Sequence, residues 1–160
     1  MSQSDKMAVD APNRFPWPPV LTIAAIAAGW LMGRLVPWHF TDESGWLALA
    51  GYVLIGLAIL IDVWALMTFR RHRANIRPDR PATKLIVDGP FTFSRNPIYL
   101  ANVLLTAGLG LALGNRWLVL GAAILFVLLQ ELAIKPEERH LRRLFPDLWT
   151  TYSALVRRWL

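Results

Sequence analysis

Four long apolar stretches limit what this 160-residue chain can fold into more than any other feature of its sequence. Each is close to the roughly 20 residues that a helix needs to cross the hydrocarbon of a bilayer, although the third is short. Hydrophobic residues make up 55% of the chain, more than a soluble domain of this size can bury. The sequence therefore predicts an all-α, polytopic membrane protein with four transmembrane helices, at about Trp17–Val36, Trp46–Phe69, Ile98–Leu113 and Trp117–Ile134.

Only Gly114-Asn115-Arg116 separates the third stretch from the fourth. Glycine and asparagine favour turns, and so short a connection forces two helices to run antiparallel, which predicts a helical hairpin. Two small-xxx-small pairs, Gly29 with Gly33 and Gly110 with Gly114, predict close helix packing.

Lysine and arginine are concentrated in two segments, Arg70 to Arg95 and the tail after the fourth stretch. The positive-inside rule then predicts that both segments and both termini face the cytosol, as they would in a bacterial inner membrane. We expect three parts: a disordered cytosolic tail (1–16), two transmembrane helices (17–69) and a core with a C-terminal cytosolic amphipathic segment (70–160).

The net charge of +6 is explained by this topology and by contact with anionic lipid. The expected partner is therefore the lipid bilayer and not nucleic acid. The chain has no cysteine and only three histidines, so we expect neither a thiolate nucleophile nor a metal site. The oligomeric state is left open.

Two polar segments flank the predicted hairpin on its basic side. The first, Val87 to Tyr99, contains a Gly-Pro turn and then Arg95, Asn96 and Pro97 at the start of a helix. Free backbone N–H groups at a helix start favour an anionic ligand, although Arg and Tyr are also common interfacial anchors. The second, Lys135 to Tyr152, begins a helix at Pro136 with two glutamates in its first turn, where carboxylates suit the helix dipole.

Taken in order, these segments resemble the isoprenylcysteine carboxyl methyltransferases, which are related to the phospholipid methyltransferases. The resemblance covers about Lys84 to Leu160. It rests on Gly-Pro-Phe, Arg-Asn-Pro-x-Tyr, the hairpin, Glu-Glu-Arg-x-Leu, Phe-x-x-x-Trp-x-x-Tyr and a closing Arg-Arg-Trp-Leu. Departures from the family pattern are Asn96 in place of histidine, Phe145-Pro146 in place of Phe-Gly, and Trp149 in place of tyrosine.

The resemblance implies an integral membrane methyltransferase that uses S-adenosyl-L-methionine. Matched position by position, the implied catalytic residues are Arg95, Tyr99 and Glu138. The implied cofactor-binding residues are Arg95, Asn96, Pro97, Tyr99, Glu137, Glu138, Leu141 and Tyr152. An arginine suits the cofactor's carboxylate, a glutamate its ribose diol and a tyrosine its sulfonium. Which glutamate contacts the ribose is left open.

The implied acceptor is a lipid-like, isoprenoid or prenylated small molecule. A carboxylate acceptor is ionised at neutral pH and needs no general base, which favours O-methylation, because the sequence has no obvious nucleophile constellation. An amine acceptor would need a base, and His140 or a glutamate could serve. The alternatives are an NADPH-dependent membrane reductase of the sterol-reductase type and a non-catalytic membrane subunit.

Two acidic residues lie within the predicted spans. Ionisable groups at such depth are candidates for function. Asp62 in the second span is assigned either a polar contact with a neighbouring helix or a substrate role. Glu131, beside Gln130 near the end of the fourth span, is expected to help line the pocket.

Overall fold

The computed structural model describes residues 17–41, 45–72 and 85–160. Within these ranges the chain is helical and contains no β-strand, as the sequence predicts. The tail expected to be disordered, residues 1–16, lies outside the described residues. The elements are α2 (Trp17–Leu35), α3 (Trp46–His72), the 3₁₀ turn η1 (Gly89–Thr92), α4 (Pro97–Ala112), α5 (Arg116–Leu129), the π-helix η2 (Gln130–Ile134), α6 (Lys135–Leu144) and α7 (Pro146–Leu155).

Three helices in the described ranges are long and apolar enough to cross a membrane: α2, α3 and the continuous helix Arg116–Leu144 formed by α5, η2 and α6. Three of the four predicted spans therefore correspond to helices that qualify as membrane spans by length and composition. The remaining one, the predicted third span, corresponds to α4, which is apolar but has only 16 residues and so measures roughly 24 Å at ~1.5 Å per residue. That is shorter than the roughly 30 Å hydrocarbon thickness, and a complete span by α4 is not established.

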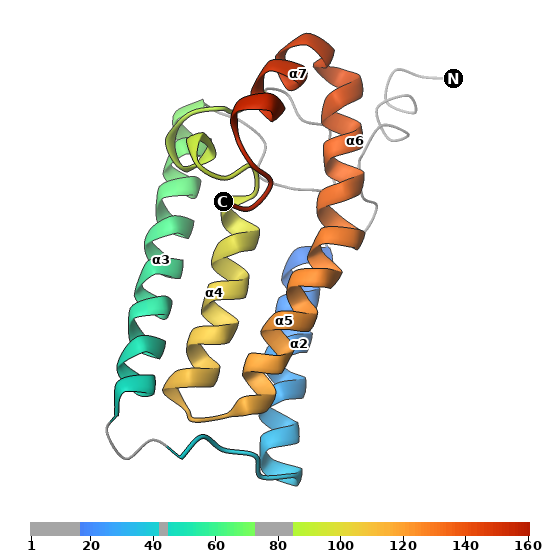
Figure 1. Ribbon diagram of the computed structural model, residues 1–160. Helices are drawn as coiled ribbons and strands as arrows, with labels where there is room; N and C mark the ends of the chain where they lie inside the picture. The colour runs from blue at the N-terminus through green and yellow to red at the C-terminus, as the bar shows by residue number, and fades with distance from the viewer. Residues whose placement is uncertain (1–16, 42–44, 73–84) are drawn as a thin grey trace.

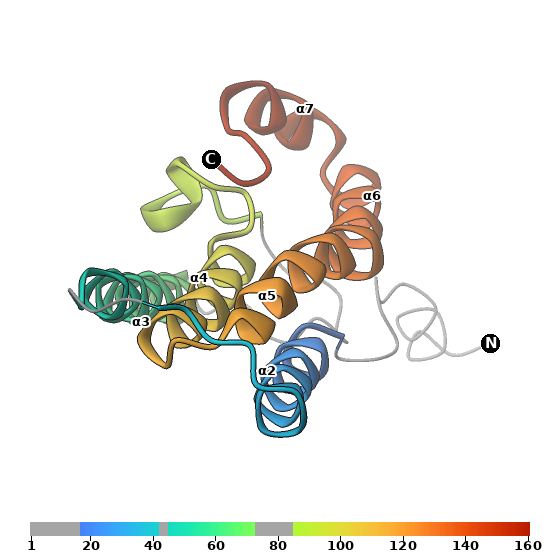
Figure 2. The same cartoon turned by 60° about the horizontal axis from the view of Figure 1, so that its bottom comes forward.

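The long helices form a layer in which α4 lies between α3 and α5, and α2 packs on α5 (Figures 1 and 2). At one end of this layer lie the α4–α5 connection and the start of α3. At the other end lie η1, α6, α7 and the C-terminus (Figure 1). Large apolar side chains on α2 and α3 remain exposed, as lipid-facing positions would be.

Glycines set the closest helix approaches. A Cβ on Gly51 of α3 would collide with the backbone of α4 at Gly108 and Ala112, so α3 and α4 cross backbone to backbone. Gly51 and Gly108 lie outside the two glycine pairs that the sequence predicts to pack closely. The predicted close packing is confirmed at Gly29, whose added Cβ would lie 2.8 Å from the Leu118 side chain. Gly114 instead forms the turn, with a φ of 64°.

Asn115 closes the predicted hairpin and joins it to α2. Its side-chain oxygen accepts hydrogen bonds from the backbone N–H groups of Trp117 (2.9 Å) and Leu118 (3.4 Å), which caps α5. Its amide nitrogen donates to the carbonyl of Gly29 in α2 at 3.1 Å. One buried side chain therefore fixes the helix start, the turn and a neighbouring helix.

The π-helix marks the passage from the apolar part of the long helix to its charged part. Pro136 follows it and has no N–H to donate to the preceding turn, and its ring would clash with the carbonyl four residues earlier. A wider π-turn relieves this conflict, and such turns often occur at functional sites. The extra residue also rotates the helix, which sets the direction in which Glu137 and Glu138 project.

Candidate functional site

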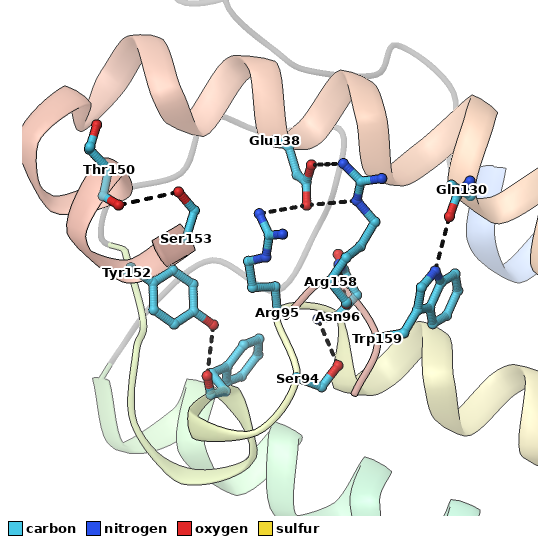
Figure 3. Close-up of polar contacts among 11 residues, drawn as sticks. Ser94, Arg95, Asn96, Gln130, Glu138, Thr150, Tyr152, Ser153, Arg158 and Trp159 are labelled. Atoms are coloured by element: carbon cyan, nitrogen blue, oxygen red, sulfur yellow. Dashed lines mark hydrogen bonds and ion pairs between the residues drawn. The ribbon is translucent and has the colours of Figure 1, made fainter. Parts of the chain in front are cut away.

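Glu138 on α6 lies at the centre of a three-residue ion cluster. Its Oε1 accepts from Arg95 Nη1 at 3.1 Å and from Arg158 Nε at 3.1 Å, and its Oε2 accepts from Arg158 Nη2 at 2.7 Å. Figure 3 shows both guanidinium groups turned toward this carboxylate. The side chain of Glu138 is 12% exposed and that of Arg95 is 15% exposed, so water screens this pair poorly. Hydrogen bonding to Glu138 raises the pKa of Arg158, so this arginine stays charged.

Glu137, the adjacent glutamate, has a different partner. The hydroxyl of Tyr99 on α4 donates to Glu137 Oε2 at 2.9 Å. The tyrosine ring is buried among Leu125, Leu129 and Ile134, so the hydroxyl is held in place by packing. The structure thus separates two glutamates that the sequence could not distinguish: Glu138 binds arginines and Glu137 binds a tyrosine.

The start of α4 brings Arg95 and Tyr99 of the Arg-Asn-Pro-x-Tyr segment to the glutamates. Pro97 is the first residue of α4 and is fully buried. Asn96 occupies the cap position, but its side chain makes no capping hydrogen bond. Its amide nitrogen instead donates to the carbonyl of Arg158 at 3.0 Å. Asn96 therefore contacts the C-terminal end of the chain.

The aromatic residues of α7 support the same region. Trp149 is almost fully buried, and Arg95 lies over its ring at 5.6 Å from the centroid. The Tyr152 hydroxyl donates to the carbonyl of Phe91 in η1 at 2.7 Å, so this tyrosine ties α7 to η1. Leu141 is partly buried against the same aromatic cluster.

The last five residues, Val156–Leu160, form a segment that we call the C-terminal strap. Its backbone carbonyl at Arg157 accepts from the N–H of Arg95 at 3.0 Å. Trp159 donates from its indole nitrogen to Gln130 Oε1 at 3.1 Å and stacks on Phe126, with ring centroids 4.3 Å apart. The strap therefore joins the start of α4 to the long helix (Figure 3).

Two predicted positions lie away from this cluster. Glu131 is exposed and pairs with Lys135 one turn further on at 2.6 Å, so the expectation that it lines the site is not supported by its contacts. Asp62 shares a face of α3 with the buried Ala58 and Ala65, by its helical spacing. Its buried Oδ1 has no hydrogen-bond partner within the described ranges, which leaves the expected polar contact unmade there.

Arg158 and Trp149 are absent from the implied site residues, although Trp149 belongs to the Phe-x-x-x-Trp-x-x-Tyr motif and Arg158 to the closing Arg-Arg-Trp-Leu. Both contact the implied site residues directly: Arg158 binds Glu138, and Trp149 lies under Arg95. A signal for Arg158 was present in the closing Arg-Arg-Trp-Leu. Its partner was not visible, because the two residues are 20 positions apart on separate elements.

Comparison with known proteins identifies the family. The family model described as phospholipid methyltransferase matches residues 46–147, more than half of the chain. The chain therefore belongs to the phospholipid methyltransferase family, a family of methyltransferases. The match includes Arg95, Tyr99 and both glutamates, and it ends before the C-terminal strap. No solved structure gives a significant match.

Two curated relatives are similar to this chain. One is the cobalt-zinc-cadmium resistance protein CzcN of Cupriavidus metallidurans, 27% identical over 69% of this chain and 47% of that protein. The other is the nickel-cobalt-cadmium resistance protein NccN of Alcaligenes xylosoxydans xylosoxydans, 26% identical over 82% of this chain and 56% of that protein. The chain thus spans about half the length of these relatives.

Proposed function

We propose that this chain is an integral membrane methyltransferase that uses S-adenosyl-L-methionine to methylate a lipid-like or isoprenoid acceptor, with carboxylate O-methylation favoured. The observation that carries the proposal is the meeting of Arg95 and Tyr99, from one end of α4, with the two glutamates of α6. Membership of the phospholipid methyltransferase family supports methyl transfer as the reaction.

The residues in this cluster suit the cofactor. Its amino-acid carboxylate needs a cation, and Arg95 has a buried Nε with no acceptor among the described residues. Its ribose diol needs an acceptor oxygen. Both oxygens of Glu138 already accept from arginines, so we assign the ribose to Glu137. Tyr99, whose hydroxyl donates to Glu137, holds that carboxylate in position.

The chemistry asks little of the protein beyond positioning. S-adenosyl-L-methionine supplies an electrophilic methyl group on a sulfonium. The protein then has to hold the acceptor oxygen in line with the methyl carbon while water is excluded. An ionised carboxylate needs no base for this step. An amine would need one, and the half-buried His140 and Glu137 lie on α6 close to the cluster.

The length of the continuous helix Arg116–Leu144 supports a site at the membrane surface. Arg116–Leu144 has 29 residues and measures roughly 43 Å at ~1.5 Å per residue, well beyond the hydrocarbon thickness. Its charged end, which carries the glutamates, therefore projects from the membrane. The excess of basic residues at this end favours the cytosolic side. A lipid-like acceptor would reach the site laterally from the adjacent leaflet.

The alternatives are a membrane reductase using NADPH and a subunit without catalysis. No contact within the described residues favours either one over methyl transfer. The names of the two relatives state metal resistance and do not define a reaction, so we transfer nothing from them to this chain.

The test is calorimetric titration of the detergent-purified protein with S-adenosylmethionine, S-adenosylhomocysteine and NADPH. We expect both sulfur ligands to bind and NADPH not to. The double substitution Arg95→Ala, Glu138→Ala should abolish this binding without loss of membrane insertion. A folded protein that binds neither sulfur ligand would refute the proposal. Incubation of membrane lipids with a labelled methyl donor would then identify the acceptor class.

A further inference from the structure

The ion cluster holds two positive groups and one negative group. Arg95 and Arg158 share the single carboxylate of Glu138, and the adjacent carboxylate, of Glu137, accepts from Tyr99. Arg158 is 33% exposed, and the other two members are less exposed. A second cation in a poorly hydrated place is costly unless another anion accompanies it. The single carboxylate of Glu138 is therefore shared by two cations, and neither arginine contacts the second carboxylate, of Glu137, which is engaged by Tyr99.

The two arginines also have hydrogen-bond donors that Glu138 does not fill. Two guanidinium groups carry ten N–H donors, and Glu138 receives three of the contacts they make. Arg95 Nε is buried and has no acceptor within the described part of the chain. Its guanidinium is held over the Trp149 ring, so it cannot turn freely toward water. An anion beside the two arginines would supply the missing acceptor.

Arg158 is held in place before any ligand arrives. Its own carbonyl accepts from Asn96, and the preceding carbonyl accepts from the N–H of Arg95. On its other side, Trp159 is fixed by Gln130 and by stacking on Phe126. Both Arg158 contacts to Glu138 come from one edge of the guanidinium, through Nε and Nη2. The remaining nitrogen, Nη1, is directed away from that edge.

We propose that Arg158, together with Arg95, forms a carboxylate-binding subsite bridged by Glu138, and that the C-terminal strap completes the cofactor site by supplying this second arginine. The carboxylate is that of the cofactor's amino-acid part, so the inference rests on the proposed function. The strap lies outside the matched family region, and only the fold brings it to Glu138. Two guanidinium groups on one carboxylate distinguish S-adenosylmethionine from analogues that lack this group.

The experiment compares two ligands that differ by this one group, S-adenosylmethionine and decarboxylated S-adenosylmethionine. Their dissociation constants are measured on the full-length protein and on Arg158→Ala, Arg158→Lys and Arg157→Ala. Arg157 is the matched control, since it is the neighbouring arginine on the strap and its side chain is exposed. Near-ultraviolet circular dichroism reports whether the tryptophan packing of the strap is intact.

We expect the native protein to bind S-adenosylmethionine at least tenfold more tightly than the decarboxylated ligand. Arg158→Ala should remove most of this preference by weakening S-adenosylmethionine alone. Arg158→Lys should restore part of it, because lysine keeps the charge but loses the fork geometry. Arg157→Ala should leave both constants within twofold of the native values.

Three results would overturn the subsite. They are a native protein that does not distinguish the two ligands, an Arg158→Ala protein that keeps the full preference, and an equal weakening of both ligands, which would assign Arg158 a purely structural role. Any of these, with S-adenosylmethionine still bound by the native protein, leaves the proposed function standing. Failure of the native protein to bind S-adenosylmethionine would refute both the subsite and the proposed function.

Discussion

Glu138→Gln is the most informative single substitution in this protein. Glutamine keeps the size of the side chain and one acceptor oxygen but removes the charge. Its NH₂ group, a donor, would replace the second acceptor oxygen and would face an arginine donor. An exposed ion pair contributes up to about 1 kcal/mol, and loss of one partner from a buried pair costs about 3–5 kcal/mol. The cluster lies between these limits because its members are 12% to 33% exposed. We therefore expect a loss of about 2 kcal/mol in unfolding free energy.

The same change should weaken cofactor binding, because Glu138 sets the positions of both arginines. If half of the 2 kcal/mol appears as lost binding free energy, the affinity for the cofactor falls about fivefold. If all of it does, the affinity falls ~30-fold. A loss of 2 kcal/mol also corresponds to a fall in Tm of roughly 4–8 °C for a domain of this size. Calorimetric titration with S-adenosylhomocysteine and a thermal melt in the same detergent measure the two effects.

Glu131→Gln is the matched control on the same continuous helix. Glu131 is 46% exposed and pairs with Lys135 on the surface, where water screens the pair, so its loss should change the unfolding free energy far less than Glu138→Gln does. Cofactor affinity should not change. Equal effects of the two substitutions, or a Glu138→Gln protein with native affinity and native Tm, would refute the reasoning from the ion cluster.

Three further predictions concern packing and positioning. Gly51→Ala should destabilise the protein by about 1–3 kcal/mol because the added Cβ meets the backbone of α4. Gly56→Ala is the control on the same helix, since its Cβ meets nothing within 4 Å and the change should be neutral or stabilising. Equal melting temperatures for the two variants would contradict the close crossing of α3 and α4. Asn115→Ala should cost about 1–3 kcal/mol through a lost helix cap and a lost hydrogen bond to α2, yet leave cofactor affinity native. A large change in affinity would count against the distance between this turn and the ion cluster at the other end of the helices. Tyr99→Phe removes a hydrogen bond to Glu137 and should weaken S-adenosylmethionine binding about tenfold in titrations; unchanged binding would argue against the ribose assignment.

The spacing of apolar residues determined the helical class and the location of the long helices. The turn at Gly114 and Asn115 determined the antiparallel hairpin, because three residues allow no other connection. The apolar spacing and the short turn are both set by consecutive residues, so they can be predicted from the sequence alone. The exact span count was harder, because α4 ends at Ala112 and its length falls short of the hydrocarbon thickness.

Partners that are distant in sequence could not be read in this way. The ordered resemblance selected Arg95, Tyr99 and the two glutamates, but it could not say which glutamate meets the arginine. That outcome depends on helix phase. The π-helix before Pro136 adds a residue to the turn, and the resulting rotation directs Glu138 toward the arginines and Glu137 toward Tyr99.

The four apolar stretches therefore determined by themselves that this is a helical protein suited to a membrane, since apolar length and periodicity are written in consecutive residues. The tertiary structure alone decided that Gly51 packs directly against the backbone of α4 and that Arg158 joins the ion cluster. The physical reason is that the first contact depends on how α3 packs against α4, and the second on how α7 folds back and where the strap then lies. These are consequences of packing between elements that no local pattern records.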